Sequence, residues 1–541
     1  MKNKFKFTTA LLMSGILGFS ACTDSFKDFN ATNGAYTDEL QKYDNQTNLV
    51  PFATIQKGII YQTGIEGTDW QYQVMQNLAA DMYAGYFHDM NGSFNDKNST
   101  YKLNDGWTSA MWTTTYSQCM PIILNSEELN TEKEFPLFNA LTKILKVTTM
   151  HRVSDYYGPI LYRNFGKTNA APESQEQVYK NFFEDLASAV TLLKNYKGAE
   201  TFAESDIMMP EGKRTHTQWL KFANSLRLRL AMRISNVNPT LAAQEAKAAL
   251  DPDNGGVLEK ANETVGQYGI RNPLGGVSAW SEVYMNASME SFITGYKDPR
   301  LEAYYVKAVG GSNEAQGNIP ELSPIAGKFK GVRQGSGVPD NRYINHSATS
   351  ITIGHKIIIM TAAEVWFLRA EAALRGYVTD KTAKECYEEG VKTSFSQWGT
   401  AGVDDYLQSN ATPSKYVDAF NAAFDAEPTT TITPKWDEAA TNEQKLERII
   451  TQKWLAIYPE GCEAWAEQRR TGYPKLFKVV VNNSDKVAGQ KIDTDIMIRR
   501  IFFPQSYKTD NATLYNALVS ALGGADNGGT RLWWDAGKNN F

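Results

Sequence analysis

The sequence predicts an all-α protein in which helix pairs build a scaffold and an irregular, loop-rich lobe is attached to it. Three observations predict this architecture. Helix-start signals recur along the chain, apolar side chains follow them at helical spacing, and long stretches rich in Gly, Pro, Asn and Ser separate the helical blocks.

Five short segments have the capping-box pattern, Ser or Thr followed three residues later by Glu or Gln, which satisfies free N–H groups where a helix begins. They are residues 174–177, 215–218, 361–364, 382–385 and 441–444. Apolar residues then recur every three or four positions, as in Val178, Phe182, Leu186, Val190 and Leu193 after the first segment. Each segment therefore predicts an amphipathic helix with one face in the core.

Small residues such as Ala370, Ala372 and Ala373 would let neighbouring helices approach closely. Short turns between helices, with small and aromatic residues at the contacts, are typical of tetratricopeptide-like stacking, although no strict 34-residue repeat is visible. We therefore expect a tetratricopeptide-like helix-pair scaffold.

Long irregular stretches interrupt the helical blocks at residues 89–107, 252–280, 308–352 and 425–440. Loops of this length are functional or disordered, and their interleaved aromatic residues argue against disorder. We expect a single domain over residues 46–541, with loop-rich insertions around 60–110, 252–352 and 400–440.

The N-terminus has the layout of a bacterial lipoprotein signal. Lys2, Lys4 and Lys6 precede an interrupted apolar stretch at residues 7–19, and small residues then precede Cys22. We expect residues 1–21 to be a signal peptide, Cys22 to be acylated, and residues 22–45 to form an anchor segment. The alternative is a plain signal peptide with Cys22 as an incidental residue.

Composition excludes several classes of protein. The net charge of −5 and the pI near 5.8 give no electrostatic reason to bind nucleic acid. Beyond Cys22 only Cys119, Cys386 and Cys462 remain, an odd number at wide spacing, so we expect buried thiols rather than a disulfide framework.

Motifs of catalysis are absent from the sequence. The five histidines lack metal-ligand spacing, and there is no nucleophile elbow, phosphate-binding loop or Cys-x-x-Cys pair. A carboxylate pair for glycoside hydrolysis stays open, because such pairs meet in space rather than in sequence. We therefore expect that the protein is not an enzyme, and the sequence predicts neither a cofactor site nor a metal site.

Two segments carry a family resemblance. Residues 360–376 (MTAAEVWFLRAEAALRG) and 450–474 (ITQKWLAIYPEGCEAWAEQRRTGYP) resemble motifs of the SusD/RagB family. Residues 155–159, 298–300, 500–504 and 533–535 add supporting matches in the family's order, whereas Tyr507 departs from a frequent Glu. In the second motif, Arg469 and Arg470 stand where they could pair with Glu463 or Glu467.

The resemblance implies a lipid-anchored protein of the outer membrane, exposed at the cell surface of Bacteroidetes. Members of the family form a lid on a SusC-like TonB-dependent transporter, capture a glycan or oligosaccharide, and deliver it into the barrel. The alternative is a peptide-capturing lid on a RagA/SusC-like transporter, because the fold does not fix the ligand.

A sugar site needs aromatic faces for C–H groups and polar edges for hydroxyls. The aromatic candidates in the loop-rich segments are Trp70, Tyr83, Tyr86, Trp107, Trp280, Tyr284 and Tyr296, and the polar candidates are Asp69, Asn104 and Arg271. We expect residues 69–107 and 271–296 to converge on one exposed cleft. The alternative for each ring is that it packs its loop against the scaffold.

The anchor gives the first testable prediction. Cys22→Ala removes the thiol that would be acylated, so the variant should incorporate no labelled palmitate and should be released from the membrane. Palmitate incorporation that survives this substitution contradicts the assignment of Cys22.

Overall fold

The computed structural model describes residues 46–60, 67–89, 94, 96–309, 312–313, 317–318, 324–336, 343, 345–537 and 539–541. Cys22 and the predicted signal peptide lie outside these residues. The chain divides into two units, Met1–Leu49 and Val50–Phe541. The described part of the first unit is only the start of helix α3 (Gln46–Gly58), so the following description concerns the second unit.

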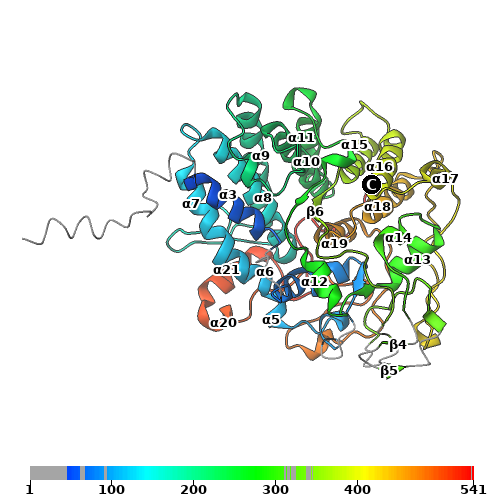
Figure 1. The fold of residues 1–541 in the computed structure, drawn as a ribbon. Helices are drawn as coiled ribbons and strands as arrows, with labels where there is room; N and C mark the ends of the chain where they lie inside the picture. Colours follow the sequence, from blue (N-terminus) through cyan, green and yellow to red (C-terminus); the bar gives the residue numbers. More distant parts are fainter. Residues whose placement is uncertain are drawn as a thin grey trace, which may run out of the picture. The chain divides into compact units, whose positions relative to one another are not determined.

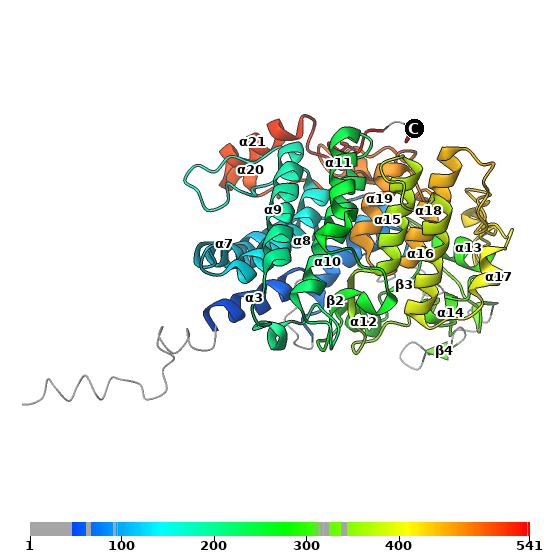
Figure 2. The same cartoon turned by 90° about the horizontal axis from the view of Figure 1, so that it is seen from above.

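The second unit is built on pairs of helices that pack side by side. The main helices are α8 (Pro136–Tyr157), α9 (Gln175–Asn195), α10 (His216–Arg233), α11 (Pro239–Leu250), α15 (Ala362–Leu374), α16 (Ala383–Trp398), α18 (Asn442–Ala456) and α19 (Gly461–Thr471). Helix α8 packs on α9, α10 on α11, and α15 on α16, while α9–α10, α10–α15 and α15–α18 contacts join the pairs (Figures 1 and 2). The predicted helix-pair scaffold is confirmed.

Shorter elements connect these helices. The helical ones are α4 (Trp70–Tyr72), the π-helix η1 (Gln73–Asp81), η2 (Asn98–Thr100), α5 (Asp105–Thr108), α6 (Ala110–Thr114), η3 (Thr115–Cys119), α7 (Met120–Leu129), η4 (Ala203–Ser205), η5 (Pro252–Asn254), η6 (Ala261–Glu263), α12 (Pro273–Ala279), α13 (Ala287–Gly295), α14 (Leu301–Tyr304), α17 (Val403–Leu407), η9 (Ala422–Phe424), η10 (Ser484–Lys486), α20 (Tyr507–Asp510) and α21 (Ala512–Leu522). The strands form antiparallel pairs, β1 (Phe87–His88) with β3 (Tyr284–Met285), β2 (Val265–Gln267) with β6 (Ile357–Met360), and β4 (Ser312–Asn313) with β5 (Gly317–Asn318).

All five predicted helix starts are capped as expected. Ser174, Thr215, Thr361, Thr382 and Thr441 each accept a hydrogen bond from the backbone N–H three residues later. The reciprocal half of the capping box is present at Thr382 and Thr441, whereas Ser174, Thr215 and Thr361 form the N-cap half alone, so the full box was predicted wrongly at these three starts.

At Thr361 the reciprocal half was predicted wrongly, because Glu364 is turned into the core. Its carboxylate accepts two hydrogen bonds from the Arg229 guanidinium, each at 2.7 Å. A buried carboxylate beside a buried guanidinium gains more from this pairing than from one backbone N–H at the helix start.

A network of buried ion pairs joins α10, α18 and α19. Two carboxylates of α19 are at its centre. Glu463 and Glu467 each accept from the guanidinium of Arg233 at 2.5 Å, and Lys453 Nζ lies 2.8 Å from Glu463. All of these side chains are almost fully buried. Each charge is therefore tolerated only because its partners are in place.

Arg470 extends the network to α15. Its guanidinium lies 2.6 Å from Glu371 and 2.7 Å from Glu467, and Arg375 also pairs with Glu371 at 2.8 Å. The expected pairing within the second family motif is confirmed for Arg470. Arg469 instead donates to three backbone carbonyls, those of Trp465, Asp155 and Arg499.

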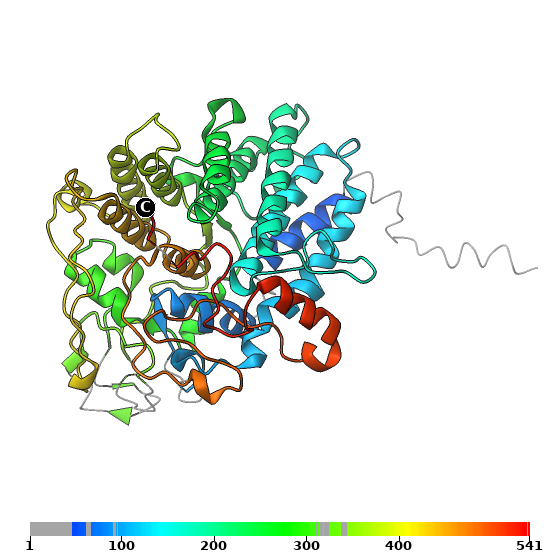
Figure 3. The same cartoon turned by 180° about the vertical axis from the view of Figure 1, so that it is seen from behind.

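The C-terminal segment returns over the scaffold (Figure 3). The indole N–H of Trp534 donates to Asp155 of α8 at 2.9 Å, and Arg500 donates to the carbonyl of Tyr157. Tyr507, the departure from the family pattern, accepts a hydrogen bond from Trp112 Nε1 at 3.1 Å. The segment that carries the last two supporting motifs is thus tied to the core.

The three cysteines beyond Cys22 are free and buried, as predicted. Trp454 and Trp465 of the second family motif are core residues, at 2% and 1% exposed. Among the described residues, no helix combines the length and the apolar character that a membrane span needs.

The ion-pair network predicts a large loss of stability when one cation is removed. Arg470→Met leaves part of the charge of Glu371 and Glu467 uncompensated in the core, so it should lower the free energy of unfolding by roughly 3–5 kcal/mol. Lys180→Met is the matched control, since it breaks an ion pair with Glu176 whose side chains are 43% and 45% exposed. The control should lose no more than about 1 kcal/mol in the same denaturant titration. Equal losses would contradict the role of the network.

The network also predicts an acid-sensitive contribution to stability. Although burial opposes its ionisation, the charges of Arg233, Lys453 and Arg229 lower the pKa of Glu463 to about 2 from an ordinary value of 4.5. Because the folded-state pKa is the lower one, the stabilisation is complete above pH 4.5 and is lost as the pH falls toward 2.

The difference in unfolding free energy between the native protein and Glu463→Gln should therefore shrink between about pH 5 and pH 3, by at most about 1.4 kcal/mol per pH unit. Urea titrations at each pH measure it. A difference that stays constant over this range would show that Glu463 is not held ionised by its neighbours.

Candidate functional site

Two of the twelve tryptophans, Trp70 and Trp280, are exposed, at 51% and 39% of their surface. Trp70 begins the short helix α4, and Trp280 follows the last residue of α12. These two helices contact each other although about 200 residues separate them in the sequence. Exposed indole rings on adjoining elements are the large apolar surfaces that binding sites present.

An ion pair fixes the two elements to each other. Arg271 donates to Asp69 Oδ2 through Nη2 at 2.8 Å and through Nε at 3.0 Å. Gly276 permits this approach, because a Cβ at that position would lie 1.9 Å from Asp69 Oδ2. Trp280 follows Gly276 by about one helical turn. The Asp69–Arg271 ion pair therefore holds both tryptophans on one part of the surface.

Residues 352–356 border the N-terminal end of α12. The backbone N–H of Asn272 donates to the Ile353 carbonyl at 2.9 Å, and its side chain donates to the Lys356 carbonyl at 3.2 Å. Ile353 itself is 45% exposed. Residues Asp69, Trp70, Arg271, Trp280 and Ile353 are called the tryptophan face below.

The structure brings together the two segments in which the sequence analysis sought the site. Gln73 Nε2 donates to Glu282 Oε2. Further along, Phe87 pairs with Met285 and His88 with Tyr284 across the β1–β3 ladder. Residues 69–89 and 271–285 are thus neighbours over most of their length, and Ile353 is an addition that sequence reasoning missed.

Four of the predicted tyrosines lie in the core and expose no ring face to a ligand, which corrects the expectation for them. Tyr83 donates to the Asn98 carbonyl, Tyr86 stacks on Trp454, and Tyr296 donates to the Ile432 carbonyl. Tyr284 is 4% exposed and packs with Val332 and Tyr343. The physical reason is regular structure: Tyr83 lies in the helical stretch 70–83, Tyr284 lies on β3, and Tyr296 directly follows α13, so these rings pack inward with their elements.

Asn104 and Trp107 belong to a different element. Asn104 caps α5 by accepting from the Gly106 N–H at 3.0 Å, and the half-buried Trp107 packs edge-on against Phe94 with ring centroids 5.0 Å apart. Helix α5 contacts η1. Within the described residues, no hydrogen bond, ion pair or ring contact joins either side chain to Trp70 or Trp280, so their part in binding stays a prediction.

The tryptophan face is suited to binding rather than to catalysis. Exposed indole rings can stack on the apolar face of a sugar ring or on apolar side chains of a peptide. The carboxylate and guanidinium of Asp69 and Arg271 supply acceptors and donors held in fixed positions.

The family model of the SusD-like group, described as Susd and RagB outer membrane lipoprotein, matches residues 28–535. The chain belongs to the SusD-like family. Members of this family are described as outer-membrane lipoproteins, which agrees with the predicted localisation. A search of curated proteins found no match.

Solved structures of SusD homologues agree with this assignment. A homologue from Bacteroides vulgatus is 45% identical, with a TM-score of 0.83, and the match covers 92% of this chain and 100% of that one. A chitin-binding SusD homologue from Flavobacterium johnsoniae is 38% identical, with a TM-score of 0.84 and the same coverage of both chains. A homologue from Bacteroides thetaiotaomicron is 33% identical, with a TM-score of 0.79 and coverage of 90% and 99%.

Proposed function

We propose that this SusD-like protein is a cell-surface lipoprotein that captures an oligosaccharide on the tryptophan face. It passes the glycan to a SusC-like TonB-dependent transporter in the outer membrane. The observation that carries the proposal is the pair of exposed tryptophans, Trp70 and Trp280, on elements joined by the partly buried Asp69–Arg271 ion pair. The capture step is binding alone, without covalent chemistry or a cofactor.

Pre-organisation supports this assignment. Asp69 is only 5% exposed and is paired, so the backbone that carries Trp70 is fixed before a ligand arrives. A rigid ring loses little conformational freedom on binding, and most of its contact with a sugar therefore contributes to affinity. A loop that had to order itself around the ligand would bind more weakly.

A glycan is favoured over a peptide by the relative from Flavobacterium johnsoniae. That protein is described as chitin-binding and shares 38% identity with this chain over nearly its whole length. Capture of a peptide for a RagA/SusC-like transporter uses the same physical features, and it is the alternative outcome of the experiment below.

Delivery to a transporter requires the lipid anchor and a partner in the same membrane. Anchoring confines both proteins to one surface, which raises the effective concentration of the binding protein at the transporter. The family description as outer membrane lipoproteins supports this part of the proposal.

The proposal predicts separate effects on affinity and stability. Trp70→Ala and Trp280→Ala each remove a stacking ring and should weaken binding of a chitin oligosaccharide by about ten- to a hundredfold, equivalent to roughly 1–3 kcal/mol. The melting temperature should stay nearly unchanged, because both rings are exposed. Calorimetry on the purified mature protein in detergent measures both quantities, and the oligosaccharide should be recovered intact.

Trp533→Ala is the matched control, because Trp533 is a half-buried tryptophan of the C-terminal segment that packs against Tyr179. It should leave affinity unchanged. The proposal for the tryptophan face fails if both exposed tryptophans can be removed without loss of affinity for any glycan on an array. Binding confined to a peptide library would instead establish the peptide alternative.

A further inference from the structure

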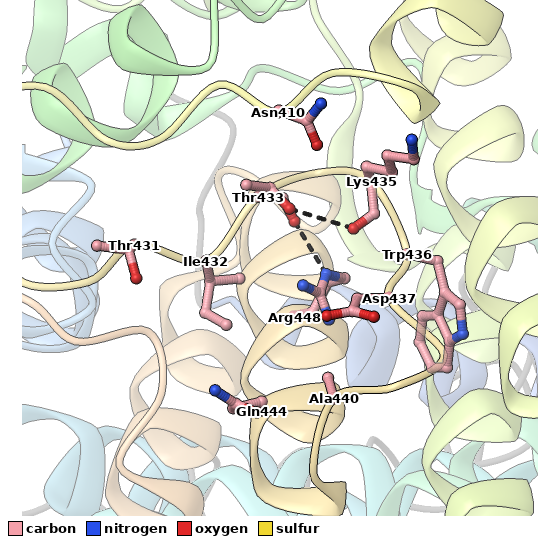
Figure 4. A pocket seen from close by; sticks show the side chains of 10 residues that line it. All are labelled: Asn410, Thr431, Ile432, Thr433, Lys435, Trp436, Asp437, Ala440, Gln444 and Arg448. Carbon is pink, nitrogen blue, oxygen red and sulfur yellow. Dashed lines mark hydrogen bonds between the residues drawn. The ribbon is translucent and has the colours of Figure 1, made fainter.

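A pocket of about 390 Å³ lies on the scaffold between α18 and the segment that precedes it (Figure 4). Its lining includes Asn410, Thr431, Lys435, Trp436, Gln444 and Arg448. None of these residues belongs to the tryptophan face. The volume is within the range of small-molecule sites, about 300–1,000 Å³.

The wall of the pocket is fixed by hydrogen bonds from neighbouring helices. Tyr296 at the end of α13 donates to the Ile432 carbonyl at 2.8 Å, and Tyr387 of α16 donates to the Pro434 carbonyl. Arg448 Nε donates to the Thr433 carbonyl at 3.0 Å. The irregular segment therefore has a defined position over α18.

Arg448 is the unusual residue of this pocket. It is 4% exposed, and its Nη1 is buried without a hydrogen-bond partner. Figure 4 shows its guanidinium among the lining side chains, beneath Thr433. A buried cationic donor that makes no hydrogen bond is costly to the folded protein, so an unfilled donor on a residue that lines a pocket indicates a missing acceptor.

Most of the other buried arginines in the described chain have a carboxylate partner, which Arg448 lacks. Within the described residues, every buried arginine except Arg448 and Arg469 forms an ion pair with a carboxylate. Arg469 is stacked on the Trp465 ring, 3.5 Å from its centroid, and it lines neither described pocket. Of the two buried arginines without an ion pair in the described part of the chain, Arg448 is the one that lines a described pocket.

Asp437, the carboxylate among the lining residues, does not form an ion pair with Arg448 in the described structure. Its Oδ1 instead accepts from the Ala439 N–H at 2.9 Å in the turn before α18. Lys435 adds a second cation at the rim. The pocket is thus suited to an anionic group.

The remaining lining groups are suited to hydroxyls. Asn410 presents an amide and Thr431 a hydroxyl, Gln444 offers its NH2 group because its Oε1 accepts from Thr441, and Trp436 forms a wall of the pocket. An aromatic wall with amide and hydroxyl groups around it is the combination that a sugar ring requires.

We propose that this pocket is a second binding site, which takes a sugar that carries a carboxylate, with Arg448 Nη1 donating to the carboxylate oxygen. The preference for a carboxylate is inferred from the unpaired Arg448 and does not depend on the proposed function. The choice of a sugar rests on the proposed function. The site would let the protein hold an acidic residue of a glycan on the scaffold while the tryptophan face holds another part or another molecule.

The experiment titrates the purified mature protein in detergent with glucuronate, glucose and acetate, followed by calorimetry. Glucuronate should bind saturably, and glucose and acetate should each bind at least tenfold more weakly, because one lacks the charge and the other lacks the ring. Arg448→Lys removes the Nη1 donor but keeps the positive charge, and Ala440→Leu places bulk in the pocket without touching Arg448. Each should weaken glucuronate binding at least tenfold.

Two control variants separate this proposal from stability effects and from the first site. Arg333→Lys changes a partly buried arginine that donates to the Phe424 and Lys478 carbonyls outside the pocket, and it should leave glucuronate affinity unchanged. Trp70→Ala should do the same, so failure of the tryptophan face is distinguishable from failure of this pocket.

Three results would overturn the proposal. The first is absence of glucuronate binding to the native protein, and the second is acetate or glucose binding as tightly as glucuronate. The third is affinity that survives Ala440→Leu, a variant that keeps the test valid even where Arg448→Lys does not fold. The melting temperature of each variant shows whether it is folded.

Discussion

The fold depends on the compensation of charge inside the helical scaffold. Glu463 and Glu467 are buried on α19, and their counter-ions come from α10 and α18 as well as from Arg470. A buried carboxylate without a partner is far less favourable than one in water, so these helices must reach their positions together. Segments more than 200 residues apart in the sequence are thereby tied to one arrangement, and the connections between them are left free to vary.

The helices themselves could be predicted because their signals are local. A hydroxyl at the N-cap can be recognised from four consecutive residues, and an apolar stripe from a few helical turns of sequence. The structure confirms all five predicted helix starts. The buried network could not be predicted in the same way. Glu364 has the spacing of a capping acid, and its partner Arg229 lies 135 residues away. Only the packing of α10 on α15 decides between the two roles.

In the candidate site, too, some features can be predicted from local sequence and others depend on tertiary packing. Trp70, Trp280 and the Asp69–Arg271 pair could be selected because they combine aromatic and polar character in irregular segments. Tyr83 and Tyr86 were selected on the same grounds, although Tyr72, Met75, Ala79, Met82 and Tyr86 recur every three or four residues and predict a buried helical stripe. Ile353 has no local signal, because it meets the N-terminal end of α12 from a segment about 80 residues away in the sequence. The pocket that Arg448 lines is formed mainly by residues 431–448, but its shape depends on how the irregular part of that segment folds over α18.

The two motifs that identify the family therefore contain residues that hold the scaffold together. Glu371 stands in the first motif, and Glu463, Glu467 and Arg470 stand in the second, and all four belong to the buried ion-pair network. The exposed tryptophans lie in neither motif. Trp70 and Trp280 are exposed and belong to no ion pair of this network, so these two side chains can change without unfolding the protein. This separation explains in physical terms why membership of the family establishes the fold and leaves the ligand to be found from exposed rings and unpaired donors.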